Sequence, residues 1–181
     1  MEEHYLHHRR SIRLPKYDYS TPGYYLVGME TKGRKEYFGY LKNEKMIFNK
    51  LGYLVKKYLK EIPNHFSNIK IDSFNILPNH IHLIILIKGK VRWGAPWRAP
   101  TTEPVLRKFG PLIPGTLSTI INSYKSTVTR KINKARFLRK DEILWQVNYF
   151  ERVIRDESEL QAFRQYIQDN PMRHWNKINP K

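Results

Sequence analysis

The sequence predicts an α+β fold of the ferredoxin-like kind, an antiparallel sheet with helices packed on it. Two observations support this fold class. Short segments alternate apolar and polar residues or are continuously apolar, as strands do, and longer segments repeat apolar residues at helical spacing. Their order along the chain is β-β-α-β-β-α-β-α, which suits helices between pairs of strands. We expect one domain at residues 23–181, preceded by a basic arm at residues 1–22.

The first half of the chain begins with two expected strands and a helix. Residues 24–30 and 36–41 are rich in β-branched or aromatic residues, and Lys32-Gly33 between them favours a turn. The second of these segments is either a new strand or the return of a hairpin. Apolar residues from Ile47 to Leu59 then recur at helical spacing, which predicts an amphipathic helix that ends before Pro63.

A central strand is predicted at residues 80–87. It follows a strand at residues 69–77 and the pair Pro78-Asn79, which suits a tight turn. Beyond its two histidines this strand is apolar on both faces. We therefore expect it to be covered on each side.

The second half of the chain starts with a long flexible connection at about residues 88–115. The part from Trp93 to Pro114 is rich in proline and lacks any period, so it either contacts nucleic acid through its aromatic and basic residues or covers the core. The expected elements after it are a helix at residues 117–132, a strand at 148–154, and a helix that begins at Asp156, with Glu159 completing a capping box, and stops at Pro171.

Composition restricts the classes of function. Lysine and arginine number 33 against 16 acidic residues, a formal charge of +17, which argues for a polyanionic partner. Twelve tyrosines, eight phenylalanines and four tryptophans favour single-stranded nucleic acid, whose bases stack on aromatic rings. A membrane surface is the weaker alternative, since no long helix has one basic and one apolar face.

The location expected from the sequence is the cytoplasm, in association with the nucleoid. No segment approaches the roughly 18 consecutive apolar residues of a membrane span, and no secretory signal follows the N-terminus. The chain has no cysteine, which excludes disulfides and thiolate zinc sites.

His80 and His82 are the first candidate site residues. Two positions apart on a strand, they point to the same face, roughly 6–7 Å apart. One divalent ion could contact both imidazoles. The alternative is a pair of histidines satisfied by carbonyl groups or water.

Tyr166 and Asn170 are the second pair. They lie one helical turn apart, about 6 Å, at the edge of an apolar stripe formed by Leu160, Phe163 and Ile167. If that stripe packs on the sheet, the side-chain amide oxygen of Asn170 could join the two histidines as a third metal ligand, with Tyr166 as the nucleophile. The alternative for Tyr166 is an aromatic residue at the edge of the core without a catalytic role. The alternative for Asn170 is an asparagine that simply ends the helix before the proline. Tyr124 is expected in the core, and Tyr149 could face either way.

Four segments resemble one known family, the REP-associated branch of the HUH single-tyrosine transposases. The segment 77–82 is similar to the His-hydrophobic-His motif of the family, and the segment 166–171 is similar to its tyrosine helix. The segments 9–20 and 145–155 resemble the REP-associated branch, so the likeness spans nearly the whole chain. The region from Trp93 to Pro114 matches nothing in the family.

The resemblance implies an HUH endonuclease-type fold and a metal-dependent transposase. Such an enzyme cleaves and rejoins single-stranded DNA near hairpins of bacterial repetitive extragenic palindromes through a 5′-phosphotyrosine. By position, Tyr166 is catalytic, His80, His82 and Asn170 bind Mg²⁺ or Mn²⁺, and a monomer is expected rather than a dimer. The candidate DNA contacts are Arg9, Arg10, Arg13, Lys125, Arg130, Arg152 and Arg155.

Two other classes of function compete with this one. A non-catalytic, structure-specific nucleic-acid-binding protein or regulator on the same fold would show salt-sensitive binding without a covalent adduct. A metal hydrolase acting on small molecules is disfavoured by the charge of +17.

Overall fold

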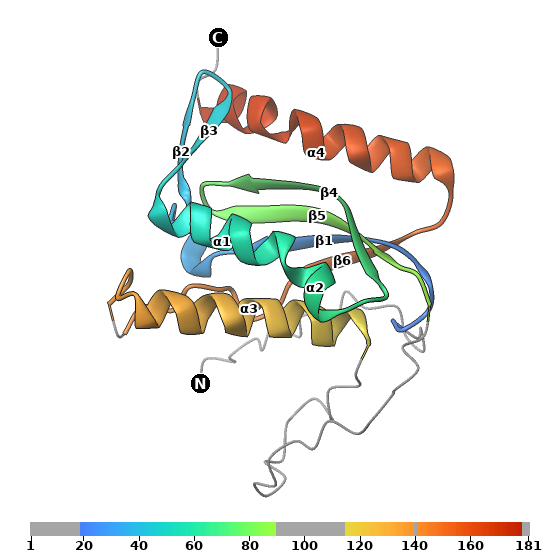
Figure 1. The fold of residues 1–181 in the computed structure, drawn as a ribbon. Coiled ribbons are helices and arrows are strands. Elements are labelled where there is room, and N and C mark those ends of the chain that lie inside the picture. Colours follow the sequence, from blue (N-terminus) through green and yellow to red (C-terminus); the bar gives the residue numbers. More distant parts are fainter. Residues whose placement is uncertain (1–18, 90–114, 140, 179–181) are drawn as a thin grey trace, which may run out of the picture.

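A four-stranded antiparallel sheet forms the centre of the protein (Figure 1). The computed structural model describes residues 19–89, 115–139 and 141–178. The strands of the sheet lie in the order β4-β5-β1-β6. Their bounds are Gly23–Glu30 for β1, Ile69–Leu77 for β4, His80–Ile87 for β5 and Phe150–Ile154 for β6.

The helices cover both faces of this sheet. Helices α1 (Lys50–Lys60), α2 (Ile62–His65) and α3 (Leu117–Lys134) lie on one face, and α4 (Glu157–Ile178) lies on the other (Figure 1). The elements β1-α1-β4-β5-α3-β6 with this strand order form the ferredoxin-like arrangement, which confirms the predicted α+β fold.

Two hydrophobic cores follow from this layering. Alternate residues of β1 and β5 pack against α1 and α3 in the larger core, and the opposite residues pack against α4 in the smaller one. The smaller core contains Leu26, Ile84, Ile154, Leu160 and Ile167. The prediction that residues 80–87 form a strand covered on both sides is therefore confirmed.

The segment after β1 decides between the two predicted alternatives, because residues 39–42 form a new strand and not the return of a hairpin with β1. A 3-10 turn at Lys32–Arg34 leads the chain away from β1. The amide of Phe38 then donates to the carbonyl of Pro78, in the turn between β4 and β5, and not to a residue of β1. The strands β2 (Gly39–Lys42) and β3 (Lys45–Phe48) then pair with each other in a separate sheet. The helix expected from Ile47 begins only at Lys50, because Ile47 belongs to β3.

Helix α4 also differs from the prediction, since it does not end at Pro171 but continues to Ile178. A proline has no amide hydrogen, so the carbonyl of Ile167, four residues earlier, loses its helical donor. The side-chain amide of Asn75 on β4 donates to this carbonyl at 3.0 Å. The sheet thus supplies the hydrogen bond that the proline removes.

The N-terminal half of α4 is held by charged groups. The Arg164 guanidinium donates two hydrogen bonds, of 2.7 and 2.6 Å, to the carboxylate of Asp72 on β4. The amide of Glu159 donates to the Asp156 carboxylate at 2.8 Å, as a capping box requires, but the Glu159 carboxylate accepts from the amide of Arg155. The predicted box is therefore half formed.

Two predictions concern segments that are mostly not described. Residues 1–18 of the arm expected at 1–22, and residues 90–114 of the connection expected at 88–115, lie outside the described residues. No helix in the described ranges is long and apolar enough to cross a bilayer.

The Asn75–Ile167 hydrogen bond can be tested by a double-mutant cycle. We expect Asn75→Ala to lower the free energy of unfolding by about 1–2 kcal/mol, because the Ile167 carbonyl loses its donor. In a Pro171→Ala background the amide of residue 171 can donate to this carbonyl. Asn75→Ala should then lower the free energy of unfolding clearly less than it does in the wild-type protein. Urea unfolding of the four proteins measures the coupling. Strictly additive costs would show that the two positions act independently.

Candidate active site

A cavity of about 590 Å³ opens where the start of β5 and the end of β1 meet the C-terminal half of α4. Its lining includes the side chains of Glu30, His80, His82, Tyr166, Asn170 and His174. All four residues that the sequence predicts for catalysis and metal binding therefore line one cavity. Their chemical roles stay predictions.

His80 and His82 lie on the face of β5 that is covered by α4. Their ring centroids are 4.9 Å apart and the rings are nearly perpendicular, at 84°. His82 lies opposite Gly28 on β1. A Cβ atom at position 28 would lie 3.3 Å from Cβ of Phe150, a tight contact, and 3.5 Å from Nδ1 of His82, an ordinary van der Waals distance.

Asn79 determines which nitrogen of His80 carries the proton. The Asn79 amide nitrogen donates to the carbonyl of Arg34 at 3.1 Å, which turns the Asn79 amide oxygen towards His80. That oxygen lies 2.6 Å from Nδ1 of His80 and can only accept, so Nδ1 must be the donor. Nε2 of His80 then keeps its lone pair, as a metal-binding imidazole requires.

Burial keeps both imidazoles neutral. Desolvation, with smaller contributions from His82, His174 and Arg34, lowers the pKa of His80 to about 3. Desolvation also lowers the pKa of His82, although the nearby Glu30 carboxylate opposes this effect. Near pH 7 both rings are therefore present in the form that binds a cation.

Tyr166 and Asn170 reach the cavity from α4. The Tyr166 ring lies 5.4 Å from the His82 ring, centroid to centroid, at 79°. Asn170 is buried, with 6% of its surface exposed. Nδ1 of His82 and Nδ2 of Asn170 are both buried and have no hydrogen-bond partner among the described residues. Buried polar groups in proteins nearly always have partners, so these two atoms keep hydrogen-bonding capacity for a group that enters the cavity.

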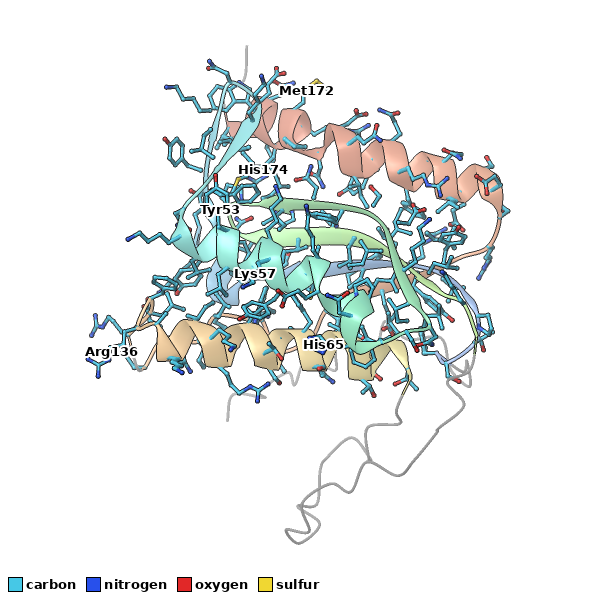
Figure 2. The ribbon with its side chains drawn as sticks, viewed as in Figure 1. Tyr53, Lys57, His65, Arg136, Met172 and His174 are labelled. Carbon is cyan, nitrogen blue, oxygen red and sulfur yellow. The ribbon has the colours of Figure 1, made fainter. Side chains whose placement is uncertain are left out.

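His174 is a cavity residue that the sequence analysis missed. Its ring centroid lies 5.7 Å from that of His80. Figure 2 shows His174 on the side of α4 that faces the sheet, whereas Met172 points away. The signal was present in the sequence, because Tyr166, Asn170 and His174 follow one another at intervals of four residues. It was overlooked because the helix was expected to stop at Pro171.

The described residues among those predicted to contact DNA do not line this cavity. Lys125 and Arg130 belong to α3, on the opposite face of the sheet (Figure 1). The Lys125 ammonium donates to the carbonyl of Gln146 at 2.7 Å, and burial lowers its pKa to about 8. Arg152 forms an ion pair with Glu159, and Arg155 is exposed. Arg9, Arg10 and Arg13 lie outside the described residues.

Tyr124 and Tyr149 are the tyrosines that compete with Tyr166. Tyr124 is buried in the larger core, as predicted, and its hydroxyl donates to the carbonyl of Val55 at 3.1 Å. Tyr149 lines the cavity.

The donor set of the cavity is compatible with a divalent cation. Within the described ranges, no three side chains of His, Cys, Asp or Glu are grouped so that they could hold a metal ion. The donors predicted from the sequence are the two neutral imidazoles and the amide oxygen of Asn170, and Glu30 and His174 line the same cavity. Imidazole with oxygen donors suits Mn²⁺, and oxygen donors suit Mg²⁺.

Comparisons with known proteins identify a relative in sequence and a solved structure of similar fold. No protein-family model matches it. An uncharacterized protein of Haemophilus influenzae is 38% identical over 169 residues, which cover 92% of this chain and 90% of the relative. Among solved structures, a REP-associated tyrosine transposase bound to a REP hairpin matches with a TM-score of 0.56 at 16% identity, over 90% of this chain and 73% of that one. The chain therefore belongs to the same family as the Haemophilus influenzae protein, and its fold is that of the HUH transposases.

Proposed function

We propose that the protein is a REP-associated type of tyrosine transposase, a metal-dependent enzyme that cleaves and rejoins single-stranded DNA near palindromic hairpins. The observation that carries the proposal is the meeting of His80, His82 and Tyr166 in one cavity, with the phenol ring 5.4 Å from an imidazole. These residues come from β5 and α4, on elements distant in sequence.

The chain's own residues would hold a cation in this cavity. Nε2 of His80, the imidazole of His82 and the side-chain oxygen of Asn170 are the donors. Mg²⁺ or Mn²⁺ held by these residues would supply Lewis-acid stabilisation of the charge on a phosphodiester. Asn79 fixes the tautomer of His80, and burial keeps both histidines neutral.

Tyr166 supplies the nucleophile. Its hydroxyl oxygen forms a bond to phosphorus while the bond from phosphorus to the 3′ oxygen breaks. The phenol loses its proton, and the departing 3′ oxygen becomes a hydroxyl group by gaining one. The product is a 5′-phosphotyrosine and a free 3′-OH, so the reverse attack rejoins the strand without ATP.

Single-stranded DNA is the proposed substrate. The charge of +17 favours a polyanion, and the solved transposase of the same fold is bound to a REP hairpin. Since one chain carries both histidines and the tyrosine, a monomer suffices for the reaction. A DNA substrate of this kind is found at the bacterial nucleoid.

The role of Tyr166 can be tested by covalent capture of DNA. We expect Tyr166→Phe to abolish a covalent adduct with a labelled single-stranded hairpin in Mn²⁺, because the attacking oxygen is absent. DNA affinity should stay within about twofold. A denaturing gel detects the adduct.

The matched control for Tyr166 is Tyr149→Phe, which alters the other tyrosine that lines the cavity. An adduct that persists in Tyr166→Phe but disappears in Tyr149→Phe would reassign the nucleophile. A wild-type protein that binds the hairpin and never forms an adduct would favour the non-catalytic binding protein.

The metal-binding residues can be tested without DNA. We expect His80→Ala to abolish high-affinity Mn²⁺ binding, and Asn79→Ala to weaken it about 10–100-fold because His80 loses its orienting partner. Titration calorimetry measures both effects. His65→Ala, which removes an exposed histidine of α2 (Figure 2), should leave the affinity unchanged. Equal affinities in all four proteins would reject this metal site.

A further inference from the structure

We propose that the part of α4 beyond Pro171 binds the backbone phosphates of single-stranded DNA that neighbour the cleaved bond. The inference rests on the proposed function and names the surface that receives the substrate. It is carried by two cations of α4, Arg173 and Lys177, which line the same cavity as the histidines and Tyr166.

The spacing of these cations suits a polyanionic chain. Arg173 and Lys177 lie four residues apart on the helix, so they are neighbours along one face, about 6 Å apart along the axis. Both side chains are exposed and can reach a ligand in the open part of the cavity. Two cations in a row are suited to consecutive phosphates of one strand.

Arg173 lies next to the proposed nucleophile. Its guanidinium carbon is 5.9 Å from the centre of the Tyr166 ring. In the proposed complex, a strand with one phosphate at the Tyr166 hydroxyl continues along α4, where its next phosphates meet Arg173 and Lys177. Arginine and lysine are the side chains that proteins use for such backbone contacts.

The carboxylates nearby leave these cations available. Glu30 lines the cavity but pairs with Arg34 at 2.9 Å. Asp169 lies 3.9 Å from Arg173, a distance at the outer limit of an ion pair on an exposed surface, where such pairs contribute little. Lys177 has no ion-pair partner among the described residues.

The phosphate-binding surface depends on the continuation of α4. A helix that ended at Pro171 would not bring residues 173 and 177 to the cavity in this register. The hydrogen bond from Asn75 to the Ile167 carbonyl supports the helix at this point. The same β4 residue lies opposite His82 in the sheet, so the support is built next to the site.

The test compares two double variants that remove the same charge. Arg173→Gln with Lys177→Gln alters the proposed surface. Lys56→Gln with Lys60→Gln alters two cations of α1 that have the same spacing but lie on the opposite face of the sheet. Fluorescence anisotropy with a labelled single-stranded oligonucleotide, over a series of salt concentrations, gives the slope of log K against log salt.

In the α4 variant the fall of log K with log salt should be shallower by about 0.7 per lost phosphate contact, hence by about 1.4 for two contacts. The α1 variant should keep the wild-type slope. Circular dichroism should show both proteins folded, because all the substitutions replace helix residues with glutamine. A slope unchanged in the α4 variant, or reduced equally in both, would overturn the proposal.

The adduct assay separates this inference from the proposed function. If the α4 variant loses phosphate contacts while the wild-type protein forms no phosphotyrosine, the binding surface stands and the proposed catalysis fails. If the wild-type protein forms the adduct while the α4 variant binds DNA with the wild-type slope, the enzyme stands and the phosphate surface fails.

Discussion

The docking of α4 on the sheet is the constraint on which the candidate site depends. The helix supplies Tyr166, Asn170 and His174, whereas β5 supplies the two other histidines, so neither element forms the cavity alone. Three kinds of contact hold the helix in register: the apolar stripe of the smaller core, the ion pair between Arg164 and Asp72, and the hydrogen bond from Asn75 to Ile167. The last two both come from β4.

Much of the fold could be predicted from the sequence because its patterns are local. The β-branched and aromatic residues of β1, the continuous apolar run of β5 and the helical spacing in α3 each identify an element without knowledge of its partners. The position of His80 and His82 on the same face of the sheet follows from the two-residue period of a strand. The expectation that Tyr166 lies near these histidines rested on the assumption that the apolar face of its helix packs on the sheet. The structure confirms that packing.

The misjudged elements are decided by partners distant in sequence. Pro171 ends a helix by the local rule, and only a residue of β4, far away in the chain, provides the hydrogen bond that overrides it. For residues 36–41 the sequence left a new strand and the return of a hairpin open, and contacts of Thr31 and Phe38 with the turn between β4 and β5 favour the new strand. The importance of His174 was hidden by the same error about Pro171.

The position of α4 in the chain has a consequence for the order in which the cavity is assembled. It is the last of the described elements, so a ribosome makes the two strand histidines well before it makes Tyr166 and Asn170. A nascent chain that has not yet reached α4 lacks every side chain that this helix contributes to the cavity. The cavity therefore forms only after α4 has been synthesised and has docked on the sheet.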